Sequence, residues 1–235
     1  LLWSPPDRVP VCTASGWQWN PDLTTDGHKG AIIAWQDGRA DYNIYVQRAD
    51  SSGVCRWTPD GVPLCTAPNV QEYPETTTDG GGGAIIAWHD ERSGALDIYA
   101  RRVDSSGAVL WTPNGVAICT ATDHQYYPRL VSDSSGGAVI VWGDARNWPY
   151  PDIYAQRVNS AGQVQWTPDV IPVCDAPNEQ FLGGQGDVLV SDGLGGAVVV
   201  WGDTRNLWVD DIYAQRIRPD GVMEWDSNGV AICVA

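Results

Sequence analysis

A unit of roughly 50 residues recurs four times along the chain, and this repeat is the feature that most limits how the chain can fold. Two of its fullest copies begin at Gly82 and Gly136. The tryptophans and tyrosines that mark the unit lie at Trp35, Trp88, Trp142 and Trp201, and at Tyr45, Tyr99, Tyr154 and Tyr213. Such a period is typical of radial or linear repeat architectures, in which one unit cannot bury its apolar faces alone.

Each unit reads as short strands separated by turns. Residues 138–142 are apolar in succession, and a strand that is apolar on both faces must be covered on both faces. Residues 128–133, 153–158 and 171–174 read as further strands, and no segment has the periodicity of a helix. We therefore predict an all-β protein, a β-propeller of four blades of about 54 residues with four strands each. A β-solenoid is the alternative, and a hairpin at the Trp-Thr-Pro segments would add a fifth strand to each blade.

The repeats define one domain over residues 1–235. We expect units at about 15–67, 68–121, 122–176 and 177–235, preceded by an extra outer strand at residues 1–14. The extra strand is inferred because the last segment of the unit occurs five times, with Val9–Cys12 matching Val230–Cys233. Its free edge predicts a homo-oligomer or filament formed by edge-strand pairing. Closure within the chain, or origin from a longer array, remains open.

Charge excludes some partners. The formal net charge is -15, which repels phosphate backbones and anionic lipids, so neither nucleic-acid binding nor membrane insertion is expected. No apolar run approaches the roughly 18–20 residues that span a bilayer. The chain opens on Leu1 with no signal peptide, which indicates a processed product or an excised piece.

The cysteines and histidines predict no redox or metal centre. Five of the six cysteines occupy one repeat position, and we expect them to be buried apolar thiols. Cys55 lies outside the pattern, and a Cys55–Cys65 disulfide is an alternative for it. The histidines occupy non-equivalent positions. We expect no cofactor, and Asp210 with Asp211 is the best local pair for Ca²⁺.

One face of the propeller carries the variable loops. In a four-stranded blade, the loop between the second and third strands shares a face with the crossing to the next blade, and aromatic residues gather in both. Aromatic rings stack on sugars, while amide and carboxylate groups bind hydroxyls, so we predict carbohydrate binding there. The alternative is that the rings plug the channel or pack between blades. The predicted aromatic ligand-binding residues are Trp19, Tyr73, Tyr127, Trp148, Tyr150 and Trp208.

One turn resembles a known motif. The segment Asp104-Ser-Ser-Gly-Ala-Val-Leu-Trp111 resembles the Asp-box turn of sialidase-type propellers, with altered spacing. The whole unit is similar to repeats of large secreted or cell-surface bacterial proteins. This resemblance implies an extracellular or cell-surface location.

The resemblance also draws attention to a repeated Asp-x-Arg. Sialidases hold a carboxylate with arginines on the analogous face, because a guanidinium is a planar bidentate donor. A residue repeated in every blade more often anchors a loop, which is the competing interpretation. The arginines join the candidate ligand-binding set as Arg39, Arg92, Arg146 and Arg205.

These observations favour a non-catalytic extracellular module over an enzyme. The repeats offer near-equivalent sites, suited to multivalent glycan binding, and glutamate is scarce. The alternative is a sialidase-like glycoside hydrolase, which needs one asymmetric site with two carboxylates.

Overall fold

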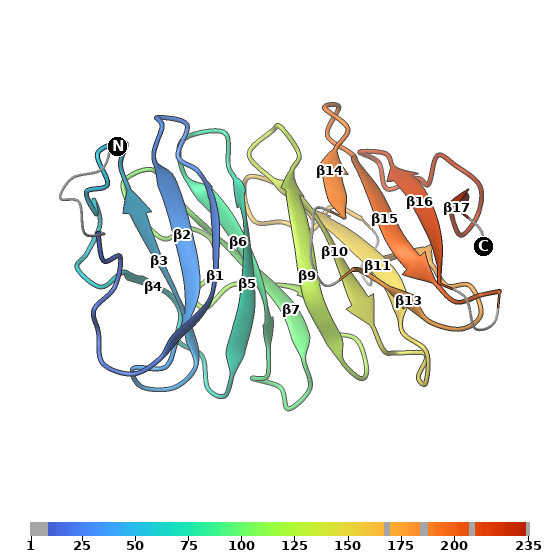
Figure 1. Cartoon of the computed structure of the whole chain (residues 1–235), viewed down its shortest axis with the longest axis horizontal. Coiled ribbons are helices and arrows are strands. Elements are labelled where there is room, and N and C mark those ends of the chain that lie inside the picture. The colour runs from blue at the N-terminus through green and yellow to red at the C-terminus, as the bar shows by residue number, and fades with distance from the viewer. Residues whose placement is uncertain (1–8, 167–169, 184–187, 207–209, 234–235) are drawn as a thin grey trace.

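The computed structural model describes residues 9–166, 170–183, 188–206 and 210–233. It confirms an all-β propeller of four blades, each an antiparallel sheet, and the described residues contain no helix. Figure 1 shows the four sheets side by side in chain order, with blade 1 at one end of the row and blade 4 at the other.

Each blade follows the order of the chain from its inner to its outer strand. Blade 1 contains β1 (Gln18–Thr25), β2 (Ala31–Asp37), β3 (Asn43–Ala49) and β4 (Val62–Cys65). Blade 2 contains β5 (Gln71–Thr78), β6 (Ala84–Asp90), β7 (Asp97–Val103) and β8 (Val116–Cys119). Blade 3 contains β9 (Gln125–Ser132), β10 (Ala138–Asp144), β11 (Asp152–Val158) and β12 (Ile171–Cys174). Blade 4 contains β13 (Gln180–Phe181), β14 (Leu189–Ser191), β15 (Ala197–Asp203), β16 (Asp211–Ile217) and β17 (Val230–Cys233). Its inner strand is divided into two pieces, because β13 and β14 both pair with β15.

The core lies between the sheets. Every residue of β6 and of β10 is buried, which explains why these strands are apolar on both faces. One face of each blade packs on the opposite face of the next: Ile32 and Ala34 of blade 1 share a cluster with Ile86 of blade 2. Because the two faces of a strand alternate, each middle strand joins two successive cores.

The turns opposite the variable loops are built alike. In blade 2, Asp79 Oδ1 accepts the backbone N–H groups of Gly81 and Gly83 at 2.7 and 2.8 Å. Its other oxygen pairs with Arg102 at 2.8 Å. Asp26, Asp133 and Asp192 do the same in the other blades. The turns on this face therefore have a structural role, because their aspartates hold each turn in shape.

The structure decides three details of the sequence interpretation. Residues 9–14, the described part of the predicted extra outer strand, form no strand, and residues 1–8 lie outside the described residues. Cys55 and Cys65 are both free thiols, so the bridge left open between them does not form. Before the Trp-Thr-Pro segments, the described residues form only single bridges, such as Val103 with Val109, so no fifth strand is added to a blade there.

Candidate active site in the central channel

The inner strands carry a repeated bulge. Asn20, Tyr73 and Tyr127 have left-handed backbones, with φ of 47°, 52° and 53°, and each precedes a proline. The strand register shifts here, as between Glu72 and Glu75. A left-handed backbone is costly for a tyrosine, so the surrounding fold must impose it. A bulge redirects side chains, and here it turns the residues around each proline toward the channel.

The inner strands of the four blades line a cavity of about 790 Å³. The residues that follow the three prolines are Asp22, Glu75 and Arg129, and all three line it. Blade 4 contributes Phe181 and Leu182 to the same wall. Equivalent positions in three repeats thus bring two carboxyl groups and one guanidinium to a single cavity. The blades are not symmetric there, because the residues at this position differ.

Glu75 has an unusual electrostatic environment. Burial raises its pKa to about 7, with Asp22 acting in the same direction, although the nearby Arg129 guanidinium opposes the shift. Arg129 Nη1 lies 2.5 Å from Glu75 Oε1. A carboxyl group with this pKa holds its proton over part of the neutral range, so Glu75 can act as a general acid.

Asp22 is held in place by the neighbouring blade. Its Oδ2 accepts the backbone N–H of Thr76 at 2.6 Å and the Thr76 hydroxyl at 2.7 Å. Thr76 directly follows Glu75 on β5, so this bond fixes the two carboxyl groups beside each other across the interface of blades 1 and 2.

Two tyrosines form an aromatic wall beside the carboxyl groups. The rings of Tyr73 and Tyr127 meet edge to face with centroids 5.2 Å apart, and both remain partly exposed. The buried His89 lies beneath them, with ring centroids 5.0 Å from Tyr73 and 5.8 Å from Tyr127. His89 Nε2 lies 3.2 Å from Glu72 Oε1. The wall offers ring faces and hydroxyl groups to a ligand in the channel.

The structure separates the other predicted aromatic residues from this wall. Trp19 packs against Trp17 and Tyr42, with centroids 5.4 and 5.5 Å away, and does not line the cavity. Trp148 and Tyr150 are exposed on the loop between β10 and β11. Trp208 lies outside the described residues.

The loops and the crossings do share one face, as the strand order predicts. The backbone N–H of Gln71, at the start of β5, binds the carbonyl of Tyr42 in the loop between β2 and β3 at 2.8 Å. Gln125 and Gln180 make the equivalent bonds to Leu96 and Pro151.

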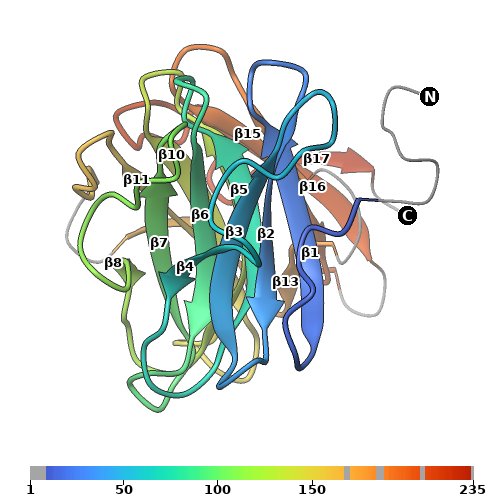
Figure 2. The same cartoon turned by 90° about the vertical axis from the view of Figure 1, so that its left-hand side faces the viewer.

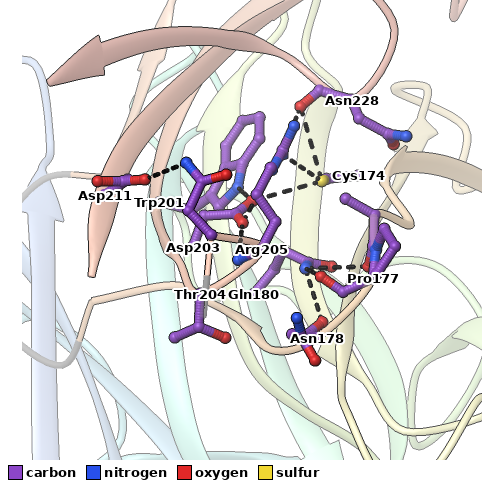
Figure 3. Close-up of polar contacts among 12 residues, drawn as sticks. Cys174, Pro177, Asn178, Gln180, Trp201, Asp203, Thr204, Arg205, Asp211 and Asn228 are labelled. Atoms are coloured by element: carbon purple, nitrogen blue, oxygen red, sulfur yellow. Dashed lines mark hydrogen bonds and ion pairs between the residues drawn. The ribbon is translucent and has the colours of Figure 1, made fainter. Parts of the chain in front are cut away.

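The four arginines of the Asp-x-Arg motif each bind the aspartate of their own blade. In blade 4, Arg205 donates two hydrogen bonds to Asp203 at 2.9 and 2.6 Å, and Asp203 also accepts from the Trp201 indole (Figure 3). The Arg205 guanidinium lies 3.8 Å from the Tyr213 ring centroid. It reaches Cys174 Sγ of the preceding blade at 3.2 Å. Arg39, Arg92 and Arg146 repeat these contacts, and none of the four lines the cavity.

Comparisons with known proteins support the fold. An endo-arabinase from Bacteroides thetaiotaomicron VPI-5482 has a TM-score of 0.56 at 13% identity, over 97% of this chain and 85% of the enzyme. An alpha-L-arabinanase from Penicillium chrysogenum, solved with arabinobiose, has a TM-score of 0.55 at 11% identity, over 92% and 69%. A family 117 glycoside hydrolase from Zobellia galactanivorans has a TM-score of 0.52 at 8% identity, over 96% and 75%. No protein-family model and no curated protein matches the sequence.

The interpretation of the chain as a non-catalytic module, and not an enzyme, is therefore corrected. The three named structures that share its fold are an endo-arabinase, an alpha-L-arabinanase and a family 117 glycoside hydrolase, so the fold does not support the expectation of a non-catalytic module. Sequence reasoning assumed near-equivalent sites in every blade. That assumption fails at the residue after the inner-strand proline, where Asp22 and Glu75 are acidic and Arg129 is basic. Aligning the three copies that contain the proline would have revealed the difference.

Among the described residues, no group of three or more histidine, cysteine, aspartate or glutamate side chains could hold a metal ion. Within the same residues, no helix is long and apolar enough to cross a membrane.

Proposed function

We propose that the protein is a glycoside hydrolase whose reaction takes place in the central channel. The observation that carries this proposal is the pair of carboxyl groups, Asp22 and Glu75, in one cavity, with the pKa of Glu75 raised by burial to about 7. Hydrolysis of a glycosidic bond uses two carboxyl groups of different protonation state, one as acid and one as base or nucleophile.

In the proposed reaction, Glu75 gives its proton to the glycosidic oxygen as the bond to the anomeric carbon breaks. Asp22, oriented by Thr76, supplies the second carboxylate, which activates water or attacks the anomeric carbon. Arg129 orients the Glu75 carboxyl group. Tyr73 and Tyr127 support the sugar ring by stacking.

The first substrate to try is linear arabinan, because two of the proteins that share the fold are named for arabinan cleavage. Xylan and a set of aryl glycosides extend the test. The measurement is the release of reducing ends at pH 6, where Glu75 is mostly protonated.

Replacing the acid tests the assignment. Glu75→Gln keeps the size of the side chain but removes the proton, so we expect kcat to fall about 1,000-fold. Glu91→Gln is the matched control, since Glu91 lies on a loop outside the cavity. If the substrate is cleaved but Glu75→Gln retains full activity, Glu75 is not the acid; no cleavage of any glycoside would overturn the function itself.

A further inference from the structure

The two end blades of the propeller each have one uncovered face. On blade 1, Leu23 is 64% exposed, whereas its repeat equivalents Leu130 and Leu189 are 8% and 7% exposed. Leu23 lies on the opposite side of β1 from Asp22, which contacts blade 2. Figure 2 faces this side of blade 1.

Blade 4 shows the complementary pattern. Ile232 of β17 is 61% exposed, whereas Leu64 and Val173 at the same repeat position are 0% and 2% exposed. Ile212 and Trp225 are likewise more exposed than their equivalents in blade 3. Within the chain, this kind of face packs on the next blade: Val139 and Val141 of blade 3 share a cluster with Val199 and Trp201 of blade 4. The two uncovered faces are therefore the two halves of one ordinary interface between blades.

Residues 9–14 already occupy part of that interface. Arg39 Nη2 lies 3.4 Å from Cys12 Sγ, as Arg92 lies 3.3 Å from Cys65 Sγ of the preceding blade. The Thr13 backbone donates to Asp60 Oδ1 at 2.7 Å, as that of Thr66 donates to Asn114 Oδ1. Although it forms no strand, this segment stands where a preceding blade would place its outermost strand.

This arrangement determines what fits between the faces. A second copy docking through its own blade 4 would bring β17 to the place that Cys12 and Thr13 hold, so the two would collide. A sheet of three strands would meet no such obstacle. We propose that the uncovered faces of blades 1 and 4 bind a three-stranded sheet with this chain's own repeat pattern, joined after β17 and completed at its outer edge by residues 9–14.

The test uses Cys233, which is exposed, whereas its equivalents Cys65, Cys119 and Cys174 are buried. The chain is extended after Ala235 by a second copy of residues 122–165, which contain β9 to β11. This join keeps the spacing that follows Cys119 in the chain. The control extension carries Ile140→Asp in the appended copy only, because Ile140 packs on the preceding blade.

We expect the extension to slow the reaction of Cys233 with a thiol reagent at least about tenfold, and to raise Tm by about 5 °C or more. The control extension should change neither value. A folded extension in which Cys233 reacts as fast as in the unextended chain would overturn the proposal.

A second measurement needs no added residues. The unextended chain should remain monomeric in light scattering, with Cys233 equally reactive at every protein concentration. Protection of Cys233 that grows with concentration, together with a dimer or filament, would show that a second copy covers these faces and would contradict the proposal.

Discussion

At the scale of single residues, the chemistry depends on one repeat position that the four blades do not share. Asp22, Glu75 and Arg129 follow the inner-strand prolines and face one cavity. Buried carboxyl groups near other charges shift in pKa according to the balance of burial, like charge and opposite charge. For Glu75, burial outweighs the guanidinium.

Removing that guanidinium gives a pH prediction. Because Glu75 must be protonated to act, activity should fall as pH rises through its pKa of about 7. Arg129 lowers this pKa, so Arg129→Met should move the alkaline limb of the pH–rate profile to higher pH. Arg56→Met, on an exposed turn, should leave the limb in place. A limb that moves to lower pH in Arg129→Met would contradict the assignment.

A second residue-scale prediction concerns the Asp-x-Arg motif. Asp144 is buried and binds both the Trp142 indole at 3.0 Å and Arg146 at 2.7 Å. Asp144→Ala removes the carboxylate that both donors bind, and we expect unfolding by urea to show a loss of about 3 kcal/mol. Arg218→Ala breaks the exposed pair with Asp220 and should cost less than about 1 kcal/mol. Equal losses in the two variants would mean that the motif does not stabilise the blade.

At the scale of the element, the turn that resembles an Asp box joins successive blades. Asp104 Oδ1 accepts the backbone N–H groups of Ser106 and Ala108, which shapes the turn. Trp111, at the end of the motif, packs on Gly162 of the next blade and donates its indole N–H to the Ser160 carbonyl at 3.1 Å. A likeness to sialidases is not needed to explain this motif.

The packing of Trp111 on Gly162 predicts a contrast between two glycines. Both Gly162 and Gly193 have positive φ, at 78° and 74°, but a Cβ at Gly162 would lie 2.7 Å from the Trp111 ring, whereas one at Gly193 would meet nothing within 4 Å. Gly193→Ala should therefore cost only about 1 kcal/mol of backbone strain. We expect Gly162→Ala to cost at least about 2 kcal/mol, measured by urea unfolding. Similar losses would refute the tight contact.

Elements of this kind were predictable because their pattern is local. Strands such as β6 and β10 are apolar on both faces, and glycine occupies many of the left-handed positions in the turns between strands. The bulges at Tyr73 and Tyr127 were not foreseen, since a left-handed tyrosine before a proline contradicts local preference and is imposed by neighbouring strands.

At the scale of the whole molecule, the period of the repeat predicts the propeller, its four blades and its variable face. The same repeat did not predict the candidate site, because the sequence analysis selected residues that recur in every blade, such as Arg39 and Arg92. Those arginines pair with the aspartates of their own blades and do not line the cavity. The channel lies where Asp22, Glu75 and Arg129 meet, and only the closeness of the inner strands in space brings these three residues together.

The central claim is that the channel holds a carboxylic acid near neutral pH. The most direct measurement is a ¹³C NMR titration of the glutamate side-chain carboxyl groups, with the Glu75 signal assigned by its loss in Glu75→Gln. We predict a midpoint near pH 7 for Glu75. A midpoint near the ordinary value of 4.5 would contradict the account, because Glu75 would then carry no proton to give at neutral pH.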